Sequence, residues 1–430
     1  MSDFFKRHIG NLSHEDEMLK TIGFESIEEL INATIPQNIR IQKQPQLPEP
    51  LSEVEYLKKI WDIAQKNKVF RSYIGQGYYG TVTPSVILRN VFENPGWYTA
   101  YTPYQAEISQ GRLEALLNFQ TMVADLTGLP LANASLLDEA TAAAEAMLMF
   151  FNARSRQQQK AGVNKFFVDE NVFQSSLDVL QTRAKFIGIE LITGKYQDFQ
   201  PDDSFFGAYV QYPDKYGQIN DFSEFAESLK THHIKLAVGT DLMSLCLFKT
   251  PAEMGADVAV GNTQRFGIPM GFGGPHAAFF AATEEFKRHI PGRIIGVSKD
   301  RHGHTAYRMA LQTREQHIKR ERATSNICTA QALLAIMAGF YAVYHGAEGL
   351  REIASNIHST TTKIYKLLET NGYELLNNTF FDTISLKVKD VSLIRQNAER
   401  HQINFNYFDN ETLSLSIDET ITEKDVIDIL

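Results

Sequence analysis

Short apolar runs alternate with amphipathic segments through the middle of the chain. Each run lies between polar turns, and the segments between the runs have the apolar spacing of helices. Runs of this kind are typical of a mostly parallel sheet that helices cover on both faces. The central region is therefore expected to be an α/β domain. The predicted strands are Lys165–Val168, Gly188–Ile192, Gly207–Gln211, Lys235–Gly239, Asp257–Val260 and Ala277–Ala281.

Two helices are predicted ahead of these strands. The first runs from Ser109 to Thr127 with leucines on one face, and Gly128 is placed to end it. The second begins at Asp138 and is rich in alanine through Ala146, so its small side chains allow close packing on a sheet. Glycine and aromatic residues crowd together between Tyr73 and Tyr104, which indicates shaped loops, where sites are often found.

The first 70 residues read as a helical arm. Helical patterns cover Glu15–Ile22 and Ser26–Ala33, with Ser26 as the expected N-cap. Three prolines between Gln42 and Pro50 then indicate an extended connection, and a third helix is predicted at about Ser52–Asn67.

The carboxyl-terminal part has a different pattern. A long helix near Thr329–Tyr344 is followed by helix, strand, strand, helix, strand, strand and helix, which predicts a small α+β domain. We therefore divide the chain into an arm (1–70), a large α/β domain (71–345) and a small domain (346–430). Because Glu423–Leu430 reads as the beginning of a helix that stops on apolar residues, we expect the chain to be truncated there.

Composition narrows the class of protein. Of 430 residues, 43% are hydrophobic and 22% charged, values of an ordinary globular protein. The net charge of −9 argues against nucleic-acid binding, because it would repel phosphate. Cys246 and Cys328 cannot build a disulfide framework and are expected to be buried and inert. With neither a secretory signal nor a membrane-spanning run, and no metal-ligand spacing, we expect a cytoplasmic enzyme or binding protein.

The layout of arm, large α/β domain and small α+β domain is similar to that of aminotransferase-like (fold type I) pyridoxal phosphate enzymes. Such chemistry needs a helix N-terminus for the phosphate, an acid beside the pyridine nitrogen and a lysine for the Schiff base. The turn Asn133–Asp138, with Ser135, is a candidate for the first, although Asp138 as a plain helix N-cap explains it as well. Asp241, after a predicted strand, is a candidate for the second, with a loop-capping carboxylate as the alternative.

The lysine is missing from the expected place. After the next predicted strand the sequence reads Gly-Asn-Thr-Gln-Arg-Phe-Gly over 261–267, with Gln264 where a lysine is needed. Lys249 comes too soon after the acid, and Lys287 lies beyond the following strand. A glutamine side chain cannot form an aldimine, and an arginine stays protonated. We therefore expect that this chain alone does not hold pyridoxal phosphate covalently.

Several long motifs resemble the glycine cleavage system P-protein family (glycine dehydrogenase, decarboxylating), and in particular its amino-terminal half. The similarity begins at Arg7-His8-Ile9-Gly10 and runs to the end of the chain. The strongest segments are Gly75–Pro84, Asn94–Gln105, Ala132–Met147, Gly271–His276 and Leu311–Gln316.

The resemblance implies half an enzyme. In that family two homologous halves pair like aminotransferase protomers, and only the carboxyl-terminal half carries the pyridoxal phosphate lysine, whose position matches Gln264 here. The whole enzyme decarboxylates glycine with that cofactor and passes an aminomethyl group to the lipoyl disulfide of the H-protein. The implied partners are thus the carboxyl-terminal half, lipoyl H-protein and glycine, and the isolated chain is expected to be inactive.

Loops of this half are expected to complete the active site of the other. The residues expected to line it are Tyr78, Tyr79, Tyr101, Thr102, Tyr104 and Gln105. Packing of these aromatic residues in the interface core is the alternative. Arg314 and His317 suit a carboxylate or surface salt bridges equally, and His276 suits a structural contact with the backbone.

Two other functions stay open. One is a free-standing pyridoxal phosphate decarboxylase or transaminase that uses an unexpected lysine, such as Lys249 or Lys299. The other is a non-catalytic scaffold or regulatory module for a lipoyl protein or partner subunit. We also expect that the isolated chain can form a homodimer through the apolar surface meant for its missing half.

Overall fold

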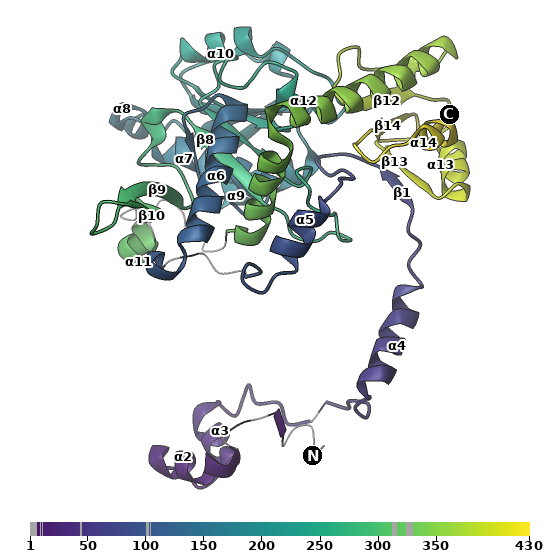
Figure 1. Ribbon diagram of the computed structural model, residues 1–430. Coiled ribbons are helices and arrows are strands. Elements are labelled where there is room, and N and C mark those ends of the chain that lie inside the picture. The colour runs from purple at the N-terminus through teal and green to yellow at the C-terminus, as the bar shows by residue number, and fades with distance from the viewer. Residues whose placement is uncertain are drawn as a thin grey trace. The chain divides into compact units, whose positions relative to one another are not determined.

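The computed structural model (Figure 1) describes residues 7–8, 10, 12–43, 45–99, 103, 105–311, 316–323 and 330–430. The chain divides into two units, Met1–Lys68 and Val69–Leu430. The domain limits expected from the sequence, 1–70, 71–345 and 346–430, stay a prediction.

The first unit holds short helices. They are α2 (Glu15–Ile22), α3 (Ile27–Thr34) and α4 (Glu53–Ala64). The Ser26 side chain accepts a hydrogen bond from the Glu29 backbone N–H at 3.1 Å, which confirms the expected N-cap. Ser52 and Glu55 form a reciprocal capping box at the start of α4. α4 ends three residues before the predicted limit, and its side chains are exposed.

The second unit is built on a mostly parallel sheet, as predicted. Its strand order is β2-β8-β7-β6-β5-β3-β4, in which β4, β3, β5, β6 and β7 run parallel. At one edge β8 pairs antiparallel with β7, and β2 pairs antiparallel with β8. The strands are β2 (Leu131–Ala132), β3 (Lys165–Asp169), β4 (Glu190–Gly194), β5 (Phe205–Tyr212), β6 (Lys235–Thr240), β7 (Val258–Asn262) and β8 (Ala278–Ala282).

Helices cover both faces of this sheet because its strands are apolar on both sides. Along β6, Leu236 and Val238 pack into one core and Ala237 into the other. The first core includes side chains of α6 (Gln110–Thr127), α10 (Ser223–Lys230) and α12 (Ala332–Thr370). The second includes α7 (Glu139–Asn152) and α9 (Gln174–Lys185) (Figure 1). Gly128 ends α6 in a left-handed conformation (φ 72°), as predicted.

The helix α12 leads from the large sheet to a smaller one. It bends at Gly346, whose φ of 63° interrupts the helical conformation. The helix–strand order that follows matches the prediction. The elements are β11 (Glu374–Leu375), β12 (Thr383–Lys387), α13 (Val391–Arg400), β13 (Ile403–Tyr407), β14 (Thr412–Ser416) and α14 (Glu423–Ile429).

Several strands of the second unit have no counterpart in the sequence prediction, among them the two-residue strand β2. The three-residue strand β1 (Arg71–Tyr73) pairs in parallel with β13, so the smaller sheet has the order β1-β13-β14-β12-β11. The strands β9 (Ile294–Lys299) and β10 (Thr305–Ala310) form an antiparallel hairpin. Among the described helices, none has a stretch long and apolar enough to span a bilayer.

Candidate functional site

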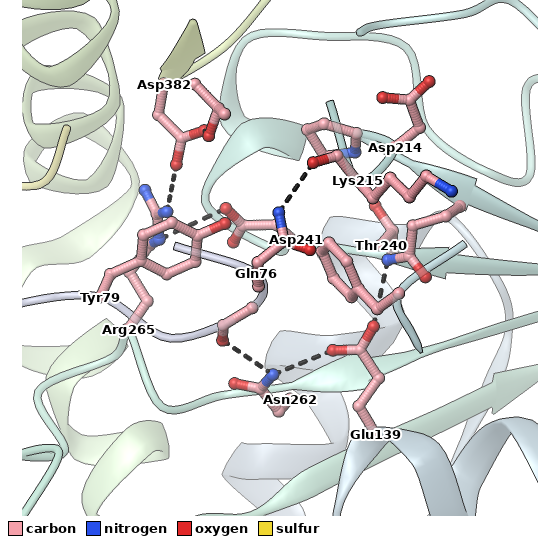
Figure 2. Close-up of a pocket in the computed structure, with 15 residues that line it drawn as sticks. Gln76, Tyr79, Glu139, Asp214, Lys215, Thr240, Asp241, Asn262, Arg265 and Asp382 are labelled. Carbon is pink, nitrogen blue, oxygen red and sulfur yellow. Dashed lines mark hydrogen bonds and ion pairs between the residues drawn. The ribbon is translucent and has the colours of Figure 1, made fainter. Parts of the chain in front are cut away.

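A small cavity lies where β5, β6 and β7 end (Figure 2). Ligands of open α/β sheets bind outside these carboxyl ends. The cavity volume is only about 20 Å³. The lining residues are Gln76, Gly77, Tyr79, Glu139, Phe173, Gln211, Pro213, Asp214, Lys215, Thr240, Asp241, Asn262, Arg265, Asp382 and Thr383.

One buried guanidinium faces two carboxylates in this cavity. Arg265 Nε lies 3.3 Å from Asp241 Oδ2, and Arg265 Nη2 donates to Asp382 Oδ2 (Figure 2). Burial disfavours the Arg265 cation, but the attraction of both carboxylates outweighs that effect and raises its pKa. Burial also raises the pKa of Asp241, and Arg265 partly offsets the rise. The predicted position of Asp241, after a strand at the carboxyl edge, is confirmed, and its cationic partner belongs to the chain itself.

The guanidinium lies against an aromatic ring that a glutamine holds in place. Arg265 Cζ is 3.4 Å from the centre of the Tyr79 ring. Gln264 accepts from the Tyr79 backbone N–H at 2.9 Å, and its Nε2 donates to the Tyr79 carbonyl at 2.9 Å and to the Ile268 carbonyl at 2.6 Å. Gln264 is 1% exposed. Its side-chain amide is therefore engaged in hydrogen bonds with the surrounding backbone.

Glu139 occupies the side of the cavity next to the first turn of α7. Its carboxylate accepts from Gln211 at 3.1 Å and from Asn262 at 2.9 Å. Burial raises the pKa of Glu139 to about 7, although these hydrogen bonds work against the rise. The nearby Asp214, also buried, has its pKa raised to about 7 for the same reason. Both acids thus titrate near neutral pH.

The N-terminus of α7 is capped by the chain's own carboxylates. Asp138 accepts from the Thr141 backbone N–H at 2.7 Å, so the plain N-cap that the sequence left open is the observed arrangement. Ser135, the candidate phosphate ligand, is fully buried and does not line the cavity. An added anion would also meet Glu139 in this first turn. The geometry therefore offers no cradle for a phosphate here.

Of the other predicted residues, those that the structure describes lie outside the cavity. Tyr78 is 40% exposed, and its hydroxyl lies 3.4 Å from His276 Nε2, with the two rings edge to face. Gln105 is exposed as well. The remaining predicted residues Tyr101, Thr102, Tyr104 and Arg314, together with Cys328 and the side chain of His317, lie outside the described part of the chain.

The lysines do not match the chemistry of a covalent cofactor. Lys215 lines the cavity, but its Nζ donates to the Glu170 carbonyl at 2.7 Å. Lys249 pairs with Asp221 at 3.0 Å, and Lys299 is exposed on β9. A pocket for a small organic ligand usually has about 300–1,000 Å³, far above the space found here. The residues around this cavity therefore do not fit pyridoxal phosphate.

Sequence reasoning missed most of the residues that fill the cavity. It did not assign Arg265 a partner, and it did not consider Asp382 or Lys215. Asp382 is 117 positions from Arg265, so no local pattern links them. The signal that was available is the direct adjacency of Arg265 to Gln264, which places a charged side chain in the same turn. Across the described residues, His, Cys, Asp and Glu form no group suited to a metal ion.

Comparison with known proteins agrees with the fold and the motifs. The family model of the glycine cleavage system P-protein matches residues 6–430. Two curated relatives, each named glycine dehydrogenase (decarboxylating), are from Christiangramia forsetii and a Nostoc species. They are 55% and 56% identical over 98% and 100% of this chain. The chain spans only 45% and 43% of their lengths.

Solved structures give the same assignment. A chain of a glycine decarboxylase (P-protein) of the glycine cleavage system, crystallised with an inhibitor, is 32% identical, with a TM-score of 0.87 and 97% of each chain covered. An aspartate aminotransferase from Thermus thermophilus, 11% identical with a TM-score of 0.58, covers 83% of this chain and 96% of its own, and shares the fold. The expected aminotransferase-like, fold type I architecture is thus confirmed, and the chain belongs to the glycine cleavage system P-protein family.

Proposed function

We propose that this chain is the amino-terminal, lysine-lacking half of a glycine decarboxylase, and that the carboxyl-terminal half holds pyridoxal phosphate. The observation that carries the proposal is Gln264. It follows β7 in the place where a Schiff-base lysine is expected, and its amide is fully engaged with the Tyr79 and Ile268 backbone. Arg265 and Glu139 line the small cavity beside it.

The reaction proposed for the complete enzyme is the decarboxylation of glycine with transfer of an aminomethyl group to lipoyl H-protein. The bond between Cα and the carboxyl group breaks, carbon dioxide leaves, and the electron pair forms a Cα–S bond. The lipoyl disulfide is the oxidant, because its S–S bond opens and the second sulfur takes up a proton as a thiol. Pyridoxal phosphate in the partner half supplies the electron sink for this step.

The contribution proposed for this half is a set of loop residues that reach the partner's site. Tyr78 and Gln105 are the described members of the predicted set that are exposed. Tyr79 is 9% exposed and its ring lies under Arg265, so in this chain it fills the cavity. Tyr78 and Gln105 are therefore the residues whose effects on the partner's chemistry are most informative.

Reconstitution tests this proposal. Carbon dioxide release from carboxyl-labelled glycine is measured with lipoyl H-protein, for this chain, for the carboxyl-terminal half and for their mixture. We expect release only from the mixture, and an unchanged result when the exposed Gln157 on α8 (Arg156–Lys160) is replaced by Ala. Full activity of the carboxyl-terminal half alone would overturn the proposal. A stable complex without release would favour a non-catalytic scaffold.

We also propose that the isolated chain can form a homodimer. The two copies would pair through the surface that contacts the carboxyl-terminal half in the complete enzyme. Sedimentation at several concentrations tests this, since a monomer–dimer equilibrium shifts with concentration. A sedimentation coefficient that rises with concentration supports pairing, and a concentration-independent monomer contradicts it.

A further inference from the structure

The buried arginine beside Gln264 joins the two sheets of the second unit. Arg265 follows β7 of the large sheet, and Asp382 immediately precedes β12 of the small sheet. The Asp382 backbone carbonyl also accepts from Ile417 N–H at 2.8 Å, just after β14. Arg265 and Asp382 are 3% and 1% exposed, so solvent does not screen this ion pair.

The same guanidinium also pairs with a second carboxylate, which lies at the end of a strand of the large sheet. Asp241 follows β6 and is half-buried, and its buried Oδ2 atom needs a cation nearby. In pyridoxal phosphate chemistry an acid pairs with the pyridine nitrogen, which is part of a planar, electron-poor ring. Here the planar cation is the Arg265 guanidinium, whose Nε lies 3.3 Å from Asp241 Oδ2.

The shape of the site fits a planar group as well as a charge. The guanidinium lies 3.4 Å from the centre of the Tyr79 ring and 5.4 Å from that of Phe381. Gln264 fixes the Tyr79 backbone from both sides. Among the described residues, Arg265 Nη1 and the Thr240 hydroxyl find no hydrogen-bond partner, and the cavity beside them has room for about one water molecule.

We propose that this pocket has become an internal guanidinium-binding site, in which Arg265 is the resident ligand that neutralises Asp241 and locks the small sheet to the large one through Asp382. The ligand class is a planar monovalent cation of the alkylguanidinium type. The proposal concerns this chain alone and holds or fails independently of the glycine reaction.

Chemical rescue of a truncated arginine tests the proposal on the full chain. Arg265→Ala is expected to lower the melting temperature by about 5–10 °C, because the buried Asp382 and the half-buried Asp241 lose their cation. Millimolar ethylguanidinium should then bind saturably and raise the melting temperature of the variant but not of the parent. N-ethylurea, which is planar but neutral, should not. The matched control, Arg183→Ala at an exposed position of α9, should behave like the parent.

Two further variants cover the case in which Arg265→Ala does not fold. Arg265→Lys keeps the charge but loses the planar fork, so its melting temperature should fall although it folds. Asp241→Asn added to Arg265→Ala should recover part of the lost stability, since it removes one of the two carboxylates left without a cation. The proposal is overturned if Arg265→Lys is as stable as the parent, if Asp241→Asn gives no recovery, or if ethylguanidinium and N-ethylurea act alike.

Discussion

The Gln264 side chain and the Tyr79 backbone form a closed pair of hydrogen bonds, each 2.9 Å long. Tyr79 N–H donates to Gln264 Oε1, and Gln264 Nε2 donates back to the Tyr79 carbonyl. The amide side chain supplies both the donor and the acceptor that this arrangement needs. The residue in the lysine position is therefore hydrogen-bonded to the loop that carries Tyr79, and Gln264 and Tyr79 are both buried.

The variant Gln264→Glu should lower the free energy of unfolding by about 3 kcal/mol at neutral pH. The new carboxylate keeps the acceptor but cannot donate to the Tyr79 and Ile268 carbonyls, and it brings a buried charge. Urea unfolding measures the loss, and Gln157→Glu at an exposed site of α8 is the control. An unchanged midpoint would show that these hydrogen bonds do not hold the loop.

The buried Glu139 should make stability depend on pH. Its folded pKa of about 7 lies above the value of 4.5 expected in the unfolded chain, so the folded state binds the proton more tightly. The stabilisation is fully present below pH 4.5 and is lost as the pH rises through about 7, by at most about 3 kcal/mol.

Urea unfolding across this pH window tests the Glu139 assignment. Glu139→Gln should flatten the decline in stability with pH, leaving the part that Asp214, with a similar pKa, contributes. Glu190→Gln, an exposed position at the start of β4, should leave the decline as it is in the parent. Equal slopes for the parent and Glu139→Gln would contradict the assignment.

A third prediction concerns Tyr78 and rests on the reconstituted enzyme. Burial raises the pKa of Tyr78 to about 12 and lowers that of His276, so at neutral pH the contact between the Tyr78 hydroxyl and His276 Nε2 joins a neutral phenol and a neutral imidazole. Tyr78→Phe should reduce turnover about tenfold, because the loss of one hydrogen bond of about 1.4 kcal/mol corresponds to a tenfold change in rate. The melting temperature of this chain should stay within about 2 °C of the parent value, because the hydroxyl is near the surface. Unchanged turnover would indicate that Tyr78 only packs.

The last helix should depend on one arginine. Arg71 in β1 donates to Asp425 at 2.8 Å and to Asp428 at 2.7 Å, both on α14. Because Arg71 is about one-third exposed, its loss should cost only about 1 kcal/mol. Arg71→Ala is expected to speed amide hydrogen exchange in α14 while α13 keeps its protection. Equal exchange in α14 of the parent and the variant would contradict this role.

Much of the fold could be predicted because its signals are local. The apolar runs predicted the strands of the large sheet except the two-residue β2, and Gly128 marked the end of α6. Ser26 and Asp138 were identified as caps from their own neighbourhoods. The strand β1 was not predictable, since three residues carry no period and its pairing with β13 spans more than three hundred positions.

The site could be predicted only in part, for a related reason. Asp241 and Gln264 were found because each follows a strand, and a strand end is visible in the sequence. The interactions that fill the cavity join Arg265 to Asp382 and Gln211 to Glu139, pairs that are distant along the chain. Glu139 accepts hydrogen bonds from Gln211 and Asn262, and these long-range contacts make it part of the cavity wall.

The most direct test of the central claim is to mix the purified chain with pyridoxal phosphate, reduce with borohydride and map modified lysines by peptide mass. The account predicts no stoichiometric, site-specific adduct, because Gln264 stands in the lysine position and Arg265 fills the cavity. A single, fully modified lysine would contradict it, most pointedly at Lys215, which lines the cavity. That result would make an independent pyridoxal phosphate enzyme the better description of this chain.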